Sequence, residues 1–220
     1  MPHQVAIRHA GSSHSLRRLI VAVVAAIVVL PSAAFAERPQ FGAKVGPSFT
    51  GILLAEDDGQ DYHPRIAAAG GGFVGFRLTR RVSLQVEGMS SPKGTRLEDD
   101  GIAQTLMLRY FEVPALVRVQ GPRLGAGAVY FIAGPFVGIR TSAKEEVSAV
   151  INSVKAGARE TVMDQIERFE TGLLAGAGLD IGRHLVVEAR YSHGLTNANR
   201  VDGAPRFTNR GLSFATGVRF

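Results

Sequence analysis

A serine, a histidine and an acid lie close together near the end of the chain, and these are the residue types of a serine hydrolase. They are Ser192 and His193, with Glu188 before them and Asn197 after them. Hydrolysis needs the imidazole beside the hydroxyl and an acid that orients the imidazole. Adjacent residues of a β-strand point to opposite faces, so Ser192 and His193 cannot form this dyad in an extended segment. Pairing of His193 with Thr196 stays open; we expect no enzyme, with a lipid-modifying enzyme as the alternative.

Two acidic clusters have the oxygen ligands that divalent cations prefer. Neither has the spacing or the distal glutamate of a calcium-binding loop, so solvated loops are favoured and no metal cofactor is expected. If the fold brings the two clusters together, cations could bridge them to anionic lipopolysaccharide, which is a hypothesis. The first cluster is Glu56, Asp57, Asp58 and Asp61, and the second is Glu98, Asp99 and Asp100.

Composition and context exclude several other kinds of chemistry. The chain has no cysteine, which rules out disulfides and thiolate metal sites. Gly70 to Gly75 has the G-x-G-x-x-G spacing of dinucleotide-binding proteins, but three alanines precede it and a strand pattern follows, so these glycines are interpreted as small residues of a strand. No dense basic patch is interleaved with aromatic residues, so we expect neither a nucleic-acid partner nor a cofactor.

The N-terminal segment has the parts of a secretory signal peptide. Three arginines and no acidic residue precede or flank an unbroken apolar run, Leu19–Leu30, and Ala34-Phe35-Ala36 forms an A-x-A cleavage site. The apolar run is short for a membrane span, which needs about 20 residues. We predict a cleaved signal peptide over residues 1–36 and a mature domain over residues 37–220, with an uncleaved anchor as the alternative. Loss of the three arginines lowers the net charge from +6 to +3.

Most of the mature chain alternates between apolar and small or polar residues with period two, which is typical of β-strands with one face against an apolar phase. The phase of the alternation changes at Tyr110-Phe111, which suggests a β-bulge. Phe73 interrupts the pattern of its segment. The eight predicted strands are about Gln40–Ile52, Gly70–Leu78, Val82–Met89, Thr105–Val119, Val129–Ile139, Phe169–Ile181, Leu185–Gly194 and Arg210–Phe220.

The connections between these strands alternate between short and long. Short turns on one side and long loops on the other are the pattern of an outer-membrane β-barrel with periplasmic turns and exterior loops. The fold class is therefore all-β, a single antiparallel transmembrane barrel of eight strands. The short connections are Thr79–Arg81, Gln120–Ala128 and Gly182–His184, and the long ones are Leu53–Ala69, Ser90–Gln104, Arg140–Arg168 and Leu195–Asn209.

The third long loop, residues 140–168, has apolar residues at helical spacing, such as Val147, Val150, Ile151 and Val154. This spacing predicts an amphipathic helix or helical pair, which could cap the barrel mouth, contact a partner or only cover its own loop. Extended hairpin strands are the structural alternative and would make a barrel of ten strands.

Alternation alone does not say which face is inside, because a soluble lipocalin-like barrel would bury the apolar face. Apart from Arg210 at the first position of the last strand, the apolar rows contain no Lys, Arg, Asp or Glu, as lipid contact demands, and they are rich in Ala and Val, which would fill a soluble core poorly. The other rows carry charges of both signs among many glycines, which suits ion pairs in a narrow lumen. This predicted lumen network is Lys44, Arg77, Glu87, Glu112, Arg118, Glu170, Asp180, Glu188, Arg190 and Arg219.

The last segment ends in an aromatic residue at the carboxyl terminus. Leu212, Phe214, Val218 and Phe220 share one face of this strand, and small or charged residues occupy the other. We interpret these four residues as the lipid-facing row of the closing strand and as a signal for the barrel-assembly machinery.

Several segments resemble the PorT-like outer-membrane β-barrel proteins, which are small members of the porin family. They are Tyr110–Val117, Tyr130–Gly138, Gly172–Leu179 and Arg190–Asn197, and the likeness spans most of residues 37–220. The resemblance implies a small barrel of roughly eight strands in the outer membrane and implies little about activity. The long, charged third loop departs from the family pattern.

The resulting expectation is a non-enzymatic outer-membrane barrel with a structural, adhesive or partner-binding role through its exterior loops. A small-solute channel is the alternative from another class, although an eight-stranded lumen filled by ion pairs should not conduct. Outer-membrane lipid, lipopolysaccharide and the barrel-assembly machinery are the expected partners, and a monomer is the expected state.

Overall fold

The computed structural model describes residues 38–54, 62–99, 102–125, 127–151, 154–199 and 206–220, and regular structure in these ranges consists of β-strands. Among these residues, no helix is long and apolar enough to span a membrane. The strands are β1 (Gln40–Leu54), β2 (Tyr62–Arg77), β3 (Val82–Asp99), β4 (Ile102–Leu124), β5 (Gly127–Ile151), β6 (Val154–Thr161), β7 (Phe169–Ile181), β8 (Leu185–Gly194) and β9 (Phe207–Arg219).

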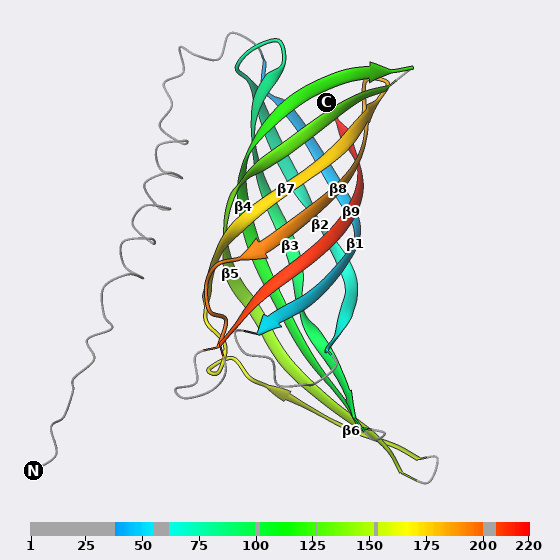
Figure 1. The fold of residues 1–220 in the computed structure, drawn as a ribbon, viewed down its shortest axis with the longest axis vertical. Helices are drawn as coiled ribbons and strands as arrows, with labels where there is room; N and C mark the ends of the chain where they lie inside the picture. Colours follow the sequence, from blue (N-terminus) through cyan, green and yellow to red (C-terminus); the bar gives the residue numbers. More distant parts are fainter. Residues whose placement is uncertain (1–37, 55–61, 100–101, 126, 152–153, 200–205) are drawn as a thin grey trace, which may run out of the picture. The chain divides into compact units, whose positions relative to one another are not determined.

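Eight of these strands form a closed antiparallel ring (Figure 1). The order around the ring is β1-β2-β3-β4-β5-β7-β8-β9, and pairing of β9 with β1 closes it, from Gly42 opposite Arg219 to Leu54 opposite Phe207. Strand β6 pairs with β5 and lies outside the ring. The predicted eight-stranded barrel is therefore confirmed, and the alternative of a ten-stranded barrel is wrong.

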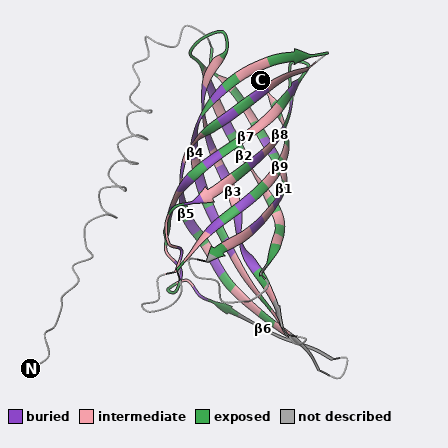
Figure 2. Ribbon diagram, viewed as in Figure 1, coloured by how far each residue is buried: buried purple, intermediate pink, exposed green. Residues whose placement is uncertain are grey.

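The barrel exposes large apolar side chains and buries charged ones. Buried and exposed residues alternate along its strands (Figure 2). Phe131 and Leu173 on the outer face are 56 % and 54 % exposed, whereas Lys44 and Glu87 on the inner face are 4 % and 2 % exposed. A soluble protein shows the opposite distribution, because burial of unpaired charge is costly and large exposed apolar surfaces associate. The outer face therefore suits lipid, and the soluble barrel is excluded.

Short turns connect strands at one end of the barrel, and the strands continue far past the barrel body at the other (Figure 1). In the β2–β3 turn, the Leu78 and Thr79 amides donate to the Val82 carbonyl at 2.9 and 3.0 Å. The β7–β8 turn uses Gly182 with φ of 63°, a left-handed conformation that favours glycine. Outer-membrane barrels place their short turns in the periplasm, so the strand extensions lie outside the cell.

The third long loop forms a β-hairpin, so the helix predicted within residues 140–168 is wrong. Strand β5 continues to Ile151, and β6 pairs with it from Lys144 opposite Thr161 to Ile151 opposite Val154. The apolar positions of this segment fit helical spacing, but many of them are β-branched valine and isoleucine, which favour strands. The β4 extension also offers a paired edge to β5, from Ile102 opposite Ala149 onward, and this edge satisfies the backbone of an extended segment.

The change of phase predicted at Tyr110 is wrong for β4, which keeps one register against β3 along its whole length. The irregularity lies in β5 instead. Arg109 pairs with Ser142 and Tyr110 pairs with Arg140, so Thr141 is an extra residue on the β5 side, as in a β-bulge.

The early apolar row of β4 consequently points into the barrel and not toward lipid. Leu108 and Tyr110, each 1 % exposed, pack with Ala143, Val162 and Ile166 in a buried apolar cluster near the exterior end. Sequence alternation could not separate this row from a lipid-facing row, because both are apolar.

Candidate functional site

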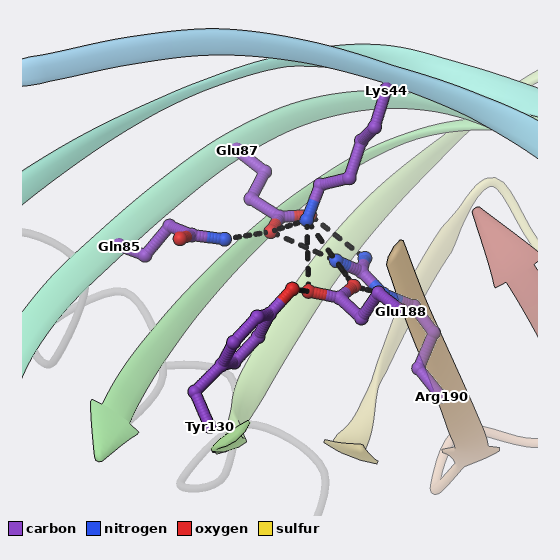
Figure 3. Close-up of polar contacts among 6 residues, drawn as sticks. All are labelled: Lys44, Gln85, Glu87, Tyr130, Glu188 and Arg190. Atoms are coloured by element: carbon purple, nitrogen blue, oxygen red, sulfur yellow. Dashed lines mark hydrogen bonds and ion pairs between the residues drawn. The ribbon is translucent and has the colours of Figure 1, made fainter. Parts of the chain in front are cut away.

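The candidate site is the lumen, where charged side chains meet at three levels. At the central level, Lys44 of β1 and Arg190 of β8 lie between the carboxylates of Glu87 of β3 and Glu188 of β8 (Figure 3). Lys44 Nζ is 2.8 Å from Glu87 Oε1 and 3.2 Å from Glu188 Oε1. Arg190 Nη1 donates to Glu87 Oε2 at 2.8 Å, and Arg190 also pairs with Glu188. We call these four residues the central cluster.

Two neutral side chains complete the hydrogen bonding of the central cluster. The Gln85 amide donates to Glu87 Oε1 at 2.6 Å, and the Tyr130 hydroxyl donates to Glu188 Oε2 at 2.9 Å (Figure 3). Each carboxylate therefore contacts both cations and one neutral donor. Buried ions are tolerated when they are paired and their remaining hydrogen-bonding capacity is met, and the central cluster meets both conditions.

The upper cluster lies toward the exterior end and consists of Lys93, Glu112 and Glu170. Lys93 Nζ is 2.8 Å from Glu112 Oε1 and 3.4 Å from Glu170 Oε1. The Asn209 amide donates to Glu170 Oε1 at 3.3 Å. Sequence reasoning missed Lys93 because it placed residues 90–104 in an exterior loop, whereas β3 continues through them; the inward alternation of Gln85 and Glu87 extends in phase to Lys93 and was the available signal.

The lower cluster lies near the short turns, where Asp180 of β7 holds two arginines. Arg219 Nη1 donates to Asp180 Oδ1 at 3.0 Å, and Arg118 Nη2 pairs with Asp180 Oδ2. Gln120 Nε2 donates to the same carboxylate at 3.4 Å. Arg77, the one residue of the predicted network that lies in none of the three clusters, is exposed at the end of β2 and lines a cavity at this mouth.

Three aromatic rings fill the lumen between these charges, and each lies against a cation. Lys44 Nζ is 5.1 Å from the centre of the Phe73 ring, Lys93 Nζ is 4.8 Å from that of Phe136, and the Arg118 guanidinium is 3.7 Å from that of Tyr130. These are cation–π distances. Phe73, which interrupted the sequence pattern, is thus an inward residue, 7 % exposed.

Inward glycines on neighbouring strands make room for the three rings. A Cβ at Gly42 would overlap the Phe73 ring, a Cβ at Gly172 would overlap the Phe136 ring, and a Cβ at Gly178 would overlap the Tyr130 ring. The glycine-rich inner rows are therefore complementary in shape to the aromatic residues opposite them.

Two cavities lie in the lumen on either side of the central cluster. The smaller, about 40 Å³, is lined by Lys93, Glu112 and Arg190, and has room for only a few water molecules. The larger, about 670 Å³, lies at the short-turn mouth, with Gln85 at its inner limit. The paired ions and rings between them fill the lumen and oppose passage of solutes through the barrel.

Residues 32–200 match the family model of the outer membrane protein β-barrel domain. The chain belongs to this family. Its strand topology agrees with that assignment, because the family's barrels cross the outer membrane as closed antiparallel rings. The protein is therefore an outer-membrane β-barrel protein. The finer likeness to PorT-like proteins stays a prediction.

The chain is also similar to solved structures of outer-membrane proteins. The attachment invasion locus protein Ail of Yersinia pestis is 12 % identical, with 84 % of this chain and 100 % of that chain covered and a TM-score of 0.43. Neisserial surface protein A is 11 % identical, with 84 % and 100 % covered and a TM-score of 0.43. OprG of Pseudomonas aeruginosa is 11 % identical, with 84 % and 97 % covered and a TM-score of 0.44. No curated protein matches the sequence.

In this family member, the serine and the histidine of the hydrolase-like group lie apart. Ser192 pairs in register with Gly211 of β9, and its hydroxyl donates to the Gly211 carbonyl at 3.5 Å. The His193 ring stacks beside Tyr191, with ring centres 6.4 Å apart. Tyr191 is exposed on the outer face, so His193 lies on the lipid side of the wall and Ser192 on the lumen side. The dyad does not form.

The other members of that group have structural partners. Thr196 Oγ1 accepts a hydrogen bond from the Thr171 amide at 3.0 Å and lies 2.9 Å from the Thr171 hydroxyl. The Asn197 side chain accepts from the Phe207 amide at 3.1 Å and organises the β8–β9 connection. Glu188 belongs to the central cluster. These contacts of Glu188, Thr196 and Asn197, within the described residues, are with other side chains and backbone groups and not with His193.

The predicted acidic clusters lie partly outside the described residues, and the glycine-rich segment lies in a strand. Glu56, Asp57, Asp58, Asp61 and Asp100 lie outside the described residues, while Glu98 and Asp99 end β3. Within the described ranges, no three histidine or acidic side chains converge as a metal site. The glycines from Gly70 to Gly75 lie within β2, as expected for a strand and not for a dinucleotide turn.

The closing strand places its four singled-out side chains on the outer face. Leu212 and Phe214 are 44 % and 45 % exposed, and Val218 and Phe220 are 39 % and 75 % exposed. The Phe220 backbone still pairs with β1 through two hydrogen bonds with Phe41, at 3.0 and 2.7 Å. The row is accessible to lipid, and its recognition by the assembly machinery stays a prediction.

Proposed function

We propose that this protein is a non-conducting and non-enzymatic outer-membrane barrel that acts through its exterior strand extensions in adhesion, partner binding or surface structure. The observation that carries the proposal is the filled lumen. Side chains from β1, β3, β5 and β8 cross the lumen and bind one another at the central cluster. A solute would have to break ion pairs between residues that are at most 6 % exposed.

The exterior extensions supply a surface suited to a protein partner. Strands β3, β4 and β5 stay paired well past the barrel body, to Asp99 opposite Ile102 and Ile102 opposite Ala149. Strand β6 pairs with β5 and has no second paired strand among the residues that the structure describes. An unpaired strand edge can accept a strand from another protein, which is a common mode of recognition.

Export and surface contacts complete the proposal. The signal peptide over residues 1–36 delivers the chain to the periplasm, and the C-terminal row of Leu212, Phe214, Val218 and Phe220 engages the barrel-assembly machinery. The two acidic clusters, Glu56, Asp57, Asp58 and Asp61 and Glu98, Asp99 and Asp100, bind lipopolysaccharide through divalent cations. The folded barrel acts as a monomer.

The first test is electrical. The refolded barrel is inserted into planar lipid bilayers, and single-channel current is recorded. We expect no stepwise conductance; steps that recur in every preparation and vanish after heat denaturation would overturn the non-conducting assignment and favour the small-channel alternative.

The second test concerns the exterior extension. Because Lys144 pairs with Thr161, an Asn-Gly turn can replace residues 145–160 without interrupting the ring. Cells that display the full or shortened barrel at equal surface density are compared for adhesion to immobilised fibronectin and laminin and for cell–cell aggregation. We expect the full barrel to increase at least one of these and the shortened barrel to lose the increase. Equal behaviour of the two would contradict a role for the hairpin.

A further inference from the structure

The larger cavity of the lumen lies at the periplasmic mouth and has an unusually basic lining. Its volume is about 670 Å³, within the range of small-molecule sites in proteins, roughly 300–1,000 Å³. Among its described lining residues, six are arginines and one is acidic, Asp180. The arginines are Arg77, Arg80, Arg81, Arg118, Arg123 and Arg219.

The single acid of this cavity is already shared. Asp180 Oδ1 accepts from Arg219 at 3.0 Å, and Asp180 Oδ2 pairs with Arg118. One carboxylate therefore balances part of the charge of two guanidinium groups, and the lining as a whole keeps a large excess of positive charge. A concave site with protein walls concentrates such a field and raises the local concentration of anions.

The cavity is closed at its inner end. Gln85 and Phe73 line it there, and the Gln85 amide is held by Glu87 of the central cluster at 2.6 Å. On the exterior side of the central cluster, the carboxylates of Glu112 and Glu170 surround the ammonium of Lys93. An anion that enters from the periplasm thus meets ion pairs and then an excess of negative charge, so the geometry favours retention at the mouth over passage.

We infer that this cavity, the periplasmic vestibule, binds a ligand that carries two or more phosphate groups or a phosphate with further negative charge. Guanidinium groups bind phosphate oxygens through paired N–H donors, and several of them around one cavity suit a polyanion. The amides of Gln40 and Gln120 and the hydroxyl of Ser83 add neutral hydrogen-bonding groups to the same lining. The phosphate comes either from a soluble compound or from the headgroup of an anionic lipid in the inner leaflet.

This inference concerns the end of the barrel opposite to the extensions of the proposed function and does not depend on them. The test uses the full mature barrel in an uncharged detergent, with sodium pyrophosphate as the probe and isothermal titration calorimetry as the measurement. We expect saturable binding at one site per barrel. Absence of saturable binding of both pyrophosphate and the lipid probe described below would overturn the inference.

Matched variants separate the vestibule from general attraction to a basic protein. R81Q/R123Q removes two exposed guanidinium groups of the lining, and R183Q/R210Q removes two exposed ones outside it. Both variants lose the same net charge and leave the buried clusters unchanged. We expect at least a tenfold weaker affinity for pyrophosphate in the first variant and less than a twofold change in the second; equal losses in both would overturn the assignment to the vestibule.

A competition experiment identifies the source of the phosphate. Mixed micelles that contain cardiolipin, whose headgroup carries two phosphates, are compared with micelles that contain phosphatidylcholine at the same total lipid. Loss of pyrophosphate binding only with cardiolipin, together with R81Q/R123Q sensitivity of lipid binding, supports an anionic headgroup as the ligand. Pyrophosphate binding that is the same in both micelles supports a soluble phosphate compound.

Discussion

The central and upper clusters lie in the same lumen and are equally buried, but their charges are balanced differently. The central cluster pairs two cations with two carboxylates, and each carboxylate contacts both cations and a neutral donor. The upper cluster sets Lys93 against both Glu112 and Glu170. Glu170 Oε2 there has no hydrogen-bond partner among the described residues. The two clusters are therefore similarly buried, but the charges and hydrogen-bonding groups of the central cluster are paired more completely than those of the upper cluster.

This difference bears on stability because the penalty of a buried charge depends on its partners. Breaking a buried pair by removing one partner is strongly destabilising, since the other charge stays buried without compensation. Removing a charge that is already in excess has no such consequence. Equivalent substitutions in the two clusters should therefore have unequal effects. Glu87→Gln and Glu170→Gln test this contrast, and Gly172→Ala tests the packing of the ring beside Lys93.

The largest effect is expected for Glu87→Gln in the central cluster. The variant keeps the shape of the side chain but leaves Lys44 and Arg190 with Glu188 as their one carboxylate, so the free energy of unfolding should fall by about 3–5 kcal/mol. Urea titration in lipid vesicles measures this change, with the folded fraction read from gel mobility of unheated samples. Glu160→Gln, at an exposed site of β6, is the control with the same charge change. A loss below about 1 kcal/mol for Glu87→Gln would refute the view that Glu87 balances the charges of Lys44 and Arg190.

An intermediate effect is expected for Gly172→Ala. A Cβ at this position would overlap the Phe136 ring and come close to the His193 carbonyl, so the ring that lies against Lys93 must move. We expect a loss of about 1–3 kcal/mol in the same titration, the usual range for overpacking. Gly51→Ala is the control, because a Cβ there meets no atom within 4 Å. Equal stabilities of the two variants would show that ring placement does not support the upper cluster.

The ring of strands was predictable because period-two alternation assigns a face to each residue directly. Lys44, Asp180 and Glu188 share a face with glycines in the sequence, and the structure places all three in the lumen. The bounds of β7 and β8 agree with the sequence prediction because charged or glycine-containing turns flank them at the short-turn end. The rule that strand faces alternate needs no knowledge of distant partners.

The contacts inside the lumen and the full lengths of the exterior strands depend on information that sequence alternation does not contain. Which cation meets which carboxylate is set by register between strands distant in sequence, as for Lys44 and Glu188. Inward aromatic residues such as Phe73 and Tyr110 look the same in sequence as lipid-facing ones. The length of the exterior strands was missed because polar residues there, Lys93 among them, follow the composition of a loop while the backbone pairs as a sheet.

The smallest effect is expected for Glu170→Gln, the counterpart of the first variant in the upper cluster. The new amide side chain would keep an oxygen for the Asn209 amide, and Lys93 would keep Glu112 at 2.8 Å as an ion-pair partner. The substitution removes a carboxylate in excess, so the free energy of unfolding should change by less than about 1 kcal/mol in either direction. The same urea titration measures it beside Glu87→Gln. A loss as large as that of Glu87→Gln would mean that another cation, such as Arg140, balances Glu170 in the folded barrel, and the contrast between the two clusters would then fail.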